Sequence, residues 1–322
     1  MPVSEVGRLT YNECAPLSLL RFPPVLLRAP PTLLLLLALH AAAFAQTPAD
    51  GPSSAPAVDL PEYFEERPKW EFAIGATALN VPDYRGSDEQ RNYLLPFPAF
   101  AYRGEVLKAD RDGVRAEFLR TDRVKFDISL NAGPPAKSDE NAARSGMPDI
   151  DPTIEVGPML KVLLAASDDR NHALSLRVPV RAVISVPDFD NRGWVFVPYL
   201  NYDIFNLFDQ KWFELGASVG VIYGSEKFHD YYYQVDPQYV TPARPAYDAT
   251  AGYSGTQFTV ALSKRFESFY IGGFARYENL SSAVFADSPL VRKDHSFMAG
   301  VVVTWIFAKS SEMVRVPLDV LR

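Results

Sequence analysis

The chain has 322 residues and a formal net charge of −7, with a mean hydropathy of −0.07. This acidic balance offers no basic surface to a nucleic acid, so we exclude a nucleic-acid partner. The sequence contains 16 Tyr, 21 Phe and 27 Pro. Such a mixture is unusual for a soluble helical protein and is typical of many strands joined by turns.

Two N-terminal segments precede the folded part. Residues 1–45 are predicted to be a secretory signal, because an apolar core at residues 33–39 precedes the small-residue cleavage pattern Ala-Phe-Ala at 43–45. That core is too short to span a membrane. The single cysteine, Cys14, lies in the signal, so the mature chain would have no disulfide and no thiolate metal site. Residues 46–69, rich in Pro, Ser and Ala, predict a flexible periplasmic linker.

After the linker, short segments alternate apolar and polar residues. In "RVKFDISLN", residues 123–131, Phe126 and Ile128 share one face, and Lys125 and Asp127 share the other. A period of two over this length predicts a strand rather than a helix. Turn-forming residues separate the segments, and the predicted strands cover about residues 70–80, 92–102, 105–109, 114–120, 122–132, 151–166, 172–186, 193–205, 211–224, 254–266, 269–281 and 295–307.

These strands predict an all-β fold, a transmembrane antiparallel up-and-down β-barrel of twelve strands over residues 70–307. Several strands reach ten residues, which is long for a soluble sandwich. Short and long connections alternate if "DRDG", residues 110–113, is a tight outer turn. The first strand then begins, and the last strand ends, on the periplasmic side. The tail, residues 308–322, shows little strand pattern, and Pro317 argues against a further strand.

The polar face of the strands is predicted to line the lumen. Six basic and five acidic residues lie on it, so we expect a packed, ion-paired interior. A narrow, weakly selective channel is the alternative. Arg177 and Arg181 share the inner face, about 13 Å apart, with Glu155 on the strand before and Asp203 on the strand after. The candidate lumen residues are Lys125, Asp127, Glu155, Lys161, Arg177, Arg181, Asp203, Glu214, Arg265, Arg276 and Glu278.

The outer loops hold a second set of candidates. "VPDYRGSDEQ", residues 81–90, is rich in turn formers and is predicted to be a structural corner rather than a ligand-binding rim. Three consecutive tyrosines in the longest outer loop either contact a sugar or a partner surface, or pack that loop onto the barrel rim, and the sequence leaves both roles open. The candidate outer-loop contacts are Asp83, Tyr84, Arg85, Asp88, Tyr231, Tyr232 and Tyr233.

No catalytic, cofactor-binding or metal site is predicted. "GASVG", residues 216–220, matches the G-x-S-x-G nucleophile elbow, but that motif requires a strand, a sharp turn and a helix, whereas here it lies inside an alternating strand. The mature histidines, His172, His229 and His295, are expected at strand ends, away from Ser218. They also lack the spacing of metal ligands. The chain is therefore expected to be non-enzymatic and to bind no cofactor.

The stretch "PDYRGSDEQRNYLLPFPAFAYRG" resembles the MipA/OmpV family, named after the MltA-interacting protein. Further matches follow in order, namely "IEVGPMLKV", "LSLRVPVRAVISV", "RGWVFVPYLNYD", "HDYYYQVDPQY" and "FADSPLVRKDHSFMAGVVVTWIF", over roughly residues 70–307. The resemblance implies a barrel embedded in the outer-membrane lipid of a Gram-negative bacterium. Through the name-giving member it implies a scaffold joining a lytic transglycosylase to a peptidoglycan synthase. Through other members it implies a porin-like small-solute channel or an adhesin.

Overall fold

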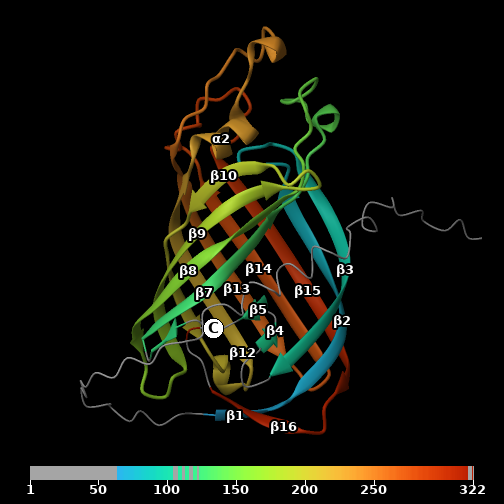
Figure 1. Ribbon diagram of the computed structural model, residues 1–322, viewed down its shortest axis with the longest axis vertical. Helices are drawn as coiled ribbons and strands as arrows, with labels where there is room; N and C mark the ends of the chain where they lie inside the picture. Colours follow the sequence, from blue (N-terminus) through green and yellow to red (C-terminus); the bar gives the residue numbers. More distant parts are fainter. Residues whose placement is uncertain are drawn as a thin grey trace, which may run out of the picture. The chain divides into compact units, whose positions relative to one another are not determined.

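The structure is a computed structural model that describes residues 64–103, 108–110, 113–115, 119–121, 123–317 and 321. The predicted signal and most of the predicted linker lie outside the described residues. One large antiparallel sheet dominates (Figure 1). Its strands are β2 (Trp70–Pro82), β3 (Gln90–Arg103), β4 (Lys108–Asp110), β5 (Gly113–Arg115), β6 (Leu119–Arg120), β7 (Val124–Gly133), β8 (Thr153–Ala166), β9 (His172–Ser185), β10 (Asn191–Phe196), β11 (Tyr199–Ile204), β12 (Phe213–Gly224), β13 (Gly252–Arg265), β14 (Phe269–Asn279) and β15 (His295–Lys309).

The order of the strands is that of an up-and-down barrel. Neighbours in the chain pair antiparallel, and β2, the first strand of the sheet, also pairs with β15, the last. The two ends of the sheet order, β5 and β6, are consecutive in the chain, with residues 116–118 between them. The sheet therefore curls until its two edges are a few residues apart, as closure into a barrel requires. This confirms the predicted fold class.

The predicted count of twelve strands is not confirmed. The described part of the sheet is divided into fourteen strands. Two of them, β10 and β11, lie one after the other between the same neighbours, β9 and β12. The strands β5 and β6 both overlap the range 114–120 that the sequence predicts as one strand, and residues 116–118 between them lie outside the described part of the chain.

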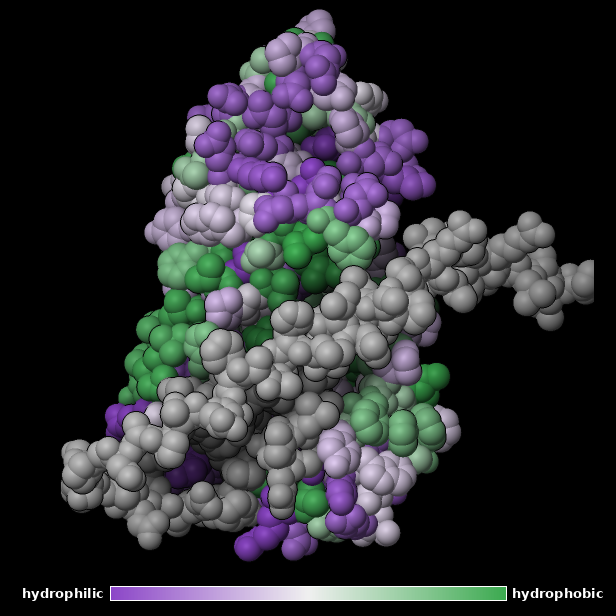
Figure 2. All heavy atoms as spheres, in the orientation of Figure 1, coloured by the Kyte–Doolittle hydropathy of each residue, from purple (hydrophilic) through white to green (hydrophobic). Residues whose placement is uncertain are grey.

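The two faces of the sheet differ in polarity as predicted. On β15, Val301 and Val303 point outward and are 58% and 48% exposed, whereas Ser296 and Thr304 point inward and are 3% and 9% exposed. Figure 2 shows hydrophobic residues over the strands and hydrophilic residues over the loops at the end that carries helix α2 (Glu226–Tyr233). An apolar outer face of this kind faces lipid, because exposing it to water would be unfavourable.

The connections are long at one end of the barrel and short at the other (Figure 1). At the long end lie α2 and the 3₁₀ turns η2 (Ser138–Glu140) and η4 (Pro237–Tyr239), whereas η3 (Leu207–Asp209) belongs to a short connection. We call these the loop end and the turn end. The connections at the loop end are residues 83–89, 134–152, 186–190, 225–251 and 280–294, of which three have fifteen residues or more, and those at the turn end include 167–171, 205–212 and 266–268, none longer than eight residues. In the part of the chain that the structure describes, no helix is both long and apolar enough to cross a membrane.

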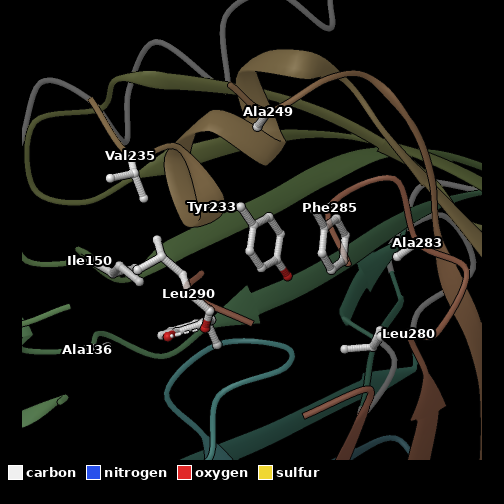
Figure 3. Packing of buried hydrophobic residues seen from close by; sticks show 10 residues of the cluster. Ala136, Ile150, Tyr233, Val235, Ala249, Leu280, Ala283, Phe285 and Leu290 are labelled. Atoms are coloured by element: carbon white, nitrogen blue, oxygen red, sulfur yellow. Dashed lines mark hydrogen bonds between the residues drawn. The ribbon is translucent and has the colours of Figure 1, made fainter. Parts of the chain in front are cut away.

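The long loops pack together into a hydrophobic core of their own, which we call the cap (Figure 3). The rings of Tyr233 and Phe285 are stacked, with centroids 3.8 Å apart and planes 9° from parallel. Ile150, Leu280 and Leu290 are at most 1% exposed. These residues come from three different loops. Ordering long loops costs conformational entropy, and the apolar contacts of the cap offset that cost.

A second, two-stranded sheet pairs β1 (Phe64–Pro68) with β16 (Met313–Pro317) in antiparallel register. This corrects two expectations, because part of the predicted flexible linker and part of the predicted strand-free tail form this ribbon. Proline is tolerated on edge strands, and both prolines stand at the last position of their strand. Each segment has only five residues, which is too short to show a period of two before its partner is known.

Candidate functional site

The inward face of β7, β8 and β9 carries a row of three cations. Lys125, Lys161 and Arg177 stand directly opposite one another in strand register. We call them the cation row. Like charges at opposite positions repel, and carboxylates lie beside them. Asp127 Oδ2 is 3.5 Å from Lys125 Nζ and 3.0 Å from Lys161 Nζ. Arg177 Nη2 is 3.0 Å from Asp203 Oδ2.

A second arginine of β9 has its own carboxylate. Arg181 Nε donates to Glu155 Oε2 at 2.8 Å, and its Nη1 donates to the hydroxyl of Ser129 at 3.2 Å. Glu155 lies on the strand before β9, and Asp203, the partner of Arg177, lies on the strand after it. These are the partners that the strand order indicates from the sequence.

The other predicted lumen residues lie elsewhere on the wall. Glu278, on β14, accepts a hydrogen bond from Nε of Arg85 in the first long loop. Arg276 Nε donates to the Thr259 hydroxyl at 3.1 Å. Glu214 lines the lumen cavity described below. The ion pairing of the interior therefore extends from the turn end to the underside of the cap.

One inward carboxylate that pairs with two arginines, Glu71 of β2, was not among the lumen residues predicted from the sequence. Glu71 is 4% exposed and accepts a hydrogen bond from Arg103 Nη2 at 2.8 Å while also pairing with Arg265. Arg103 Nη1 donates to the Pro68 carbonyl at 2.7 Å, which ties the ribbon to the barrel. The alternation that places Phe72 outward also places Glu71 inward, so the pattern contained this signal.

The lumen holds a cavity of about 980 Å³. At the turn end it is bounded by Glu65 and Arg67 of β1 and by Val316 of β16. The indole Nε1 of Trp212 donates to Glu65, and the Arg67 guanidinium lies 4.8 Å from the centre of the Trp212 ring. Contact with Trp212 therefore holds the ribbon against the barrel at the border of the cavity.

The first long loop is built into the cap. Asp83 is 3% exposed and accepts a hydrogen bond from Asn141 Nδ2 at 2.9 Å. Tyr84 is 4% exposed and donates its hydroxyl to the Leu290 carbonyl at 2.8 Å. Of the four candidates in this loop, only Asp88 is exposed. These contacts favour the structural-corner interpretation over a ligand-binding rim.

The three consecutive tyrosines pack α2 onto the barrel rim. Tyr231 accepts a hydrogen bond from the Asp151 amide at 2.7 Å, and Tyr232 packs against the cap core. Tyr233 donates to the Arg85 carbonyl at 3.0 Å and is 1% exposed. A side chain buried to this extent offers no surface to a partner, so the geometry favours loop packing for Tyr233.

A serine and a histidine form a hydrogen bond, although not at the G-x-S-x-G motif of residues 216–220. His229 Nδ1 lies 2.5 Å from the Thr250 carbonyl oxygen, so this nitrogen carries the proton and Nε2 accepts from the Ser254 hydroxyl. Hydrolases use such pairs, but both side chains are 0% exposed, which leaves no path for a substrate. Ser218 lies inside β12, as expected. Among the described residues, no group of three or more potential metal ligands occurs.

A family model described as the MltA-interacting protein MipA matches residues 74–307. The chain belongs to the MipA family. A curated relative, outer membrane protein Omp26La of Vibrio anguillarum, is 26% identical over 242 residues, covering 73% of this chain and 84% of the relative. An outer-membrane channel of Pseudomonas putida is 11% identical, with a TM-score of 0.38, over 79% of this chain and all of the other. A bacterial polysaccharide outer-membrane secretin is 8% identical, with a TM-score of 0.36, over 74% and 99%.

This MipA family member is an outer-membrane β-barrel protein of a Gram-negative bacterium. In such barrels the long loops face the outside of the cell, and the short turns face the periplasm. The cap therefore lies on the cell surface. The β1–β16 ribbon lies at the periplasmic end.

The cap is expected to lose stability in mild acid. Burial lowers the pKa of His229 below its ordinary value of 6.5, and the Arg85 guanidinium adds to this, while the hydrogen bond to the Thr250 carbonyl opposes it. Neutral His229 thus stabilises the folded cap fully above pH 6.5, and this stabilisation is lost as the pH falls through the folded pKa. Limited proteolysis of the loops between about pH 8 and pH 5 should show faster cleavage in acid.

A matched pair of variants isolates this effect. His229→Gln cannot gain a proton, so cleavage of its cap should depend less on pH. His295→Gln removes a histidine whose side chain is 46% exposed, and it should keep the pH dependence of the unaltered protein. Equal pH dependence in both variants would show that His229 is not responsible.

Proposed function

We propose that this MipA family member is a non-enzymatic outer-membrane scaffold that binds a peptidoglycan-remodelling enzyme, either a lytic transglycosylase or a peptidoglycan synthase. The observation that carries the proposal is the β1–β16 ribbon at the periplasmic end. Among the described strands, β1 and β16 pair only with each other. Each therefore has one edge that no other described strand pairs with, and such an edge can bind a strand of a partner.

The outer face of the ribbon is suited to a contact. Glu66 and Arg315 stand opposite each other in register and are exposed, and Met313 beside them is 50% exposed. Glu65 and Arg67 face the barrel instead. An apolar side chain next to exposed charges of both signs is a common composition for a protein-binding surface.

The lumen supports the same proposal. The ion pairs of its wall hold side chains across neighbouring strands, and the loop end carries a packed hydrophobic cap. Both features favour a rigid support over an open pore, because an open pore would leave its lining charges in contact with water rather than with each other.

Affinity capture of the tagged mature chain from membranes tests the scaffold. We expect it to recover a transglycosylase or a peptidoglycan synthase. The double variant Glu66→Arg with Arg315→Glu keeps opposite charges facing each other within the ribbon. It reverses the sign of the charge that each position presents to a partner, so recovery of the enzyme should fall about tenfold. As a control, Glu226→Lys with Lys227→Glu makes the same exchange at exposed positions of α2. Recovery of neither enzyme class, or equal recovery by both double variants, would contradict the proposal.

A small-solute channel is the second candidate, and the cavity of about 980 Å³ favours it. Its volume is in the range of ligand sites, and charged side chains line it. Planar-bilayer recordings of the purified barrel separate the two candidates. The scaffold proposal predicts little conductance, whereas steady single-channel currents would favour the channel.

A further inference from the structure

The ribbon lies across the turn end of the lumen cavity. Its strands present Glu65 and Arg67 of β1 and Val316 of β16 to the cavity, and Figure 1 shows β1 and β16 beneath the ends of the barrel strands. Glu66 is exposed, whereas Glu65 and Arg67 on either side of it are partly buried. One face of the ribbon therefore faces the lumen, and the other faces the periplasm.

The ribbon is joined to the barrel by two short connections that pair with each other. Lys69 alone separates β1 from β2, and residues 310–312 separate β15 from β16. The Lys69 amide donates to the Glu312 carbonyl at 2.9 Å. The Ser310 amide donates to the Trp70 carbonyl, also at 2.9 Å. Since hinges are formed by a few residues at the ends of elements, these paired connections allow the two strands of the ribbon to turn as one unit.

Away from these connections, Trp212 holds the ribbon. Its indole Nε1 donates to Glu65, and the Arg67 guanidinium lies 4.8 Å from the centre of its ring. A cation over an aromatic face and a hydrogen bond to a carboxylate are each stronger than a contact between neutral groups. Because one side chain makes both contacts, a movement of Trp212 breaks both of them together.

Trp212 ends a turn with an unusual backbone. Four of the eight residues in the connection 205–212 have φ between 52° and 62°, namely Asn206, Phe208, Asp209 and Trp212. Residues other than glycine rarely adopt this left-handed region. Such conformations persist only where the surrounding structure holds them, and they gather at ligand clamps and switch regions. The turn therefore has the character of a switch region rather than of an ordinary connection.

We propose that the ribbon is a hinged lid over the periplasmic mouth of the lumen, and that Trp212 is its latch. While Trp212 holds Glu65 and Arg67, the lid separates the charged lining of the cavity from the periplasm. When the latch is released, the ribbon turns about its two connections, and the cavity of about 980 Å³ opens to periplasmic solutes. The lid uses the inner face of the ribbon, whereas the scaffold proposal rests on its outer edges and outer face.

Thiol accessibility inside the cavity tests the lid, because the mature chain without residues 1–45 contains no cysteine. Ser263→Cys places a thiol on the cavity wall, and Ser282→Cys makes the same replacement at an exposed position of the loop end. In the full mature chain folded in detergent, a charged maleimide should label position 263 at least about tenfold more slowly, because that thiol reacts only while the lid is open. Equal rates at the two positions would overturn the proposal.

Variants of Trp212 identify the latch. Combined with Ser263→Cys, Trp212→Ala should raise the labelling rate about tenfold. Trp212→Phe keeps an aromatic ring for Arg67 and loses the indole donor, so it should raise the rate less. As a control, Trp305→Ala removes a tryptophan that is 51% exposed on the outer face of β15, and it should leave the rate low.

Heat-modifiable gel migration verifies that each variant is folded. Folded Trp212 variants with an unchanged labelling rate at position 263 would also overturn the lid. Enzyme capture is a separate measurement on the outer face of the ribbon, so a failure of the scaffold proposal and a failure of the lid are distinguishable.

Discussion

Glu71→Ala is expected to lower the free energy of unfolding in detergent by about 3 kcal/mol, near the lower end of the range for breaking a buried ion pair. The carboxylate is 5% exposed and serves both Arg103 and Arg265, whose side chains are 16% and 19% exposed. Its removal takes away the carboxylate that both guanidinium groups share. Denaturant unfolding, followed by tryptophan fluorescence, measures the change.

Two comparisons make this result specific. Glu71→Gln keeps acceptor oxygen but loses the charge, so it should destabilise less than Glu71→Ala. Asp294→Ala removes a carboxylate whose side chain is 76% exposed, and it should change the free energy of unfolding by no more than about 1 kcal/mol. If Glu71→Ala were no more harmful than Asp294→Ala, the charges around Glu71 would have to be solvated, and the lumen would be an open aqueous space.

Val260→Arg is expected to prevent efficient insertion into lipid. Val260 is 51% exposed on the outer face of β13, close to the middle of that strand, and an arginine at the bilayer midplane costs about 2–4 kcal/mol in such barrels. Folding into lipid vesicles, measured by the fraction with heat-modifiable gel migration, should fall strongly.

The chain contains a matched control for this substitution. Val240 is 45% exposed but lies in the long loop after η4, outside the sheet. Val240→Arg therefore adds the same side chain at nearly the same exposure without placing it in lipid, and folding should be almost unchanged. Equal folding of both variants would mean that β13 does not face the bilayer.

Local alternation in the sequence determined the barrel and the polarity of its two faces. A strand turns successive side chains to opposite sides, so their spacing alone predicts that Lys125 and Asp127 point inward and that Phe126 and Ile128 point outward. The order of strands in an up-and-down barrel follows the order of the chain. For that reason the sequence alone identifies Glu155 and Asp203 as neighbours of Arg181 and Arg177, and the structure pairs them.

Only the tertiary structure decided the features that join segments distant in the chain. The pairing of Phe64–Pro68 with Met313–Pro317 has no local signature, because a five-residue strand is stabilised by its partner rather than by its own pattern. The shared role of Glu71, the packing of Tyr233 against Phe285 and the contact of Trp212 with the ribbon depend in the same way on which side chains the closed barrel and its loops bring together. The residues of each contact are far apart in the chain, so no local pattern indicates that they come together on folding.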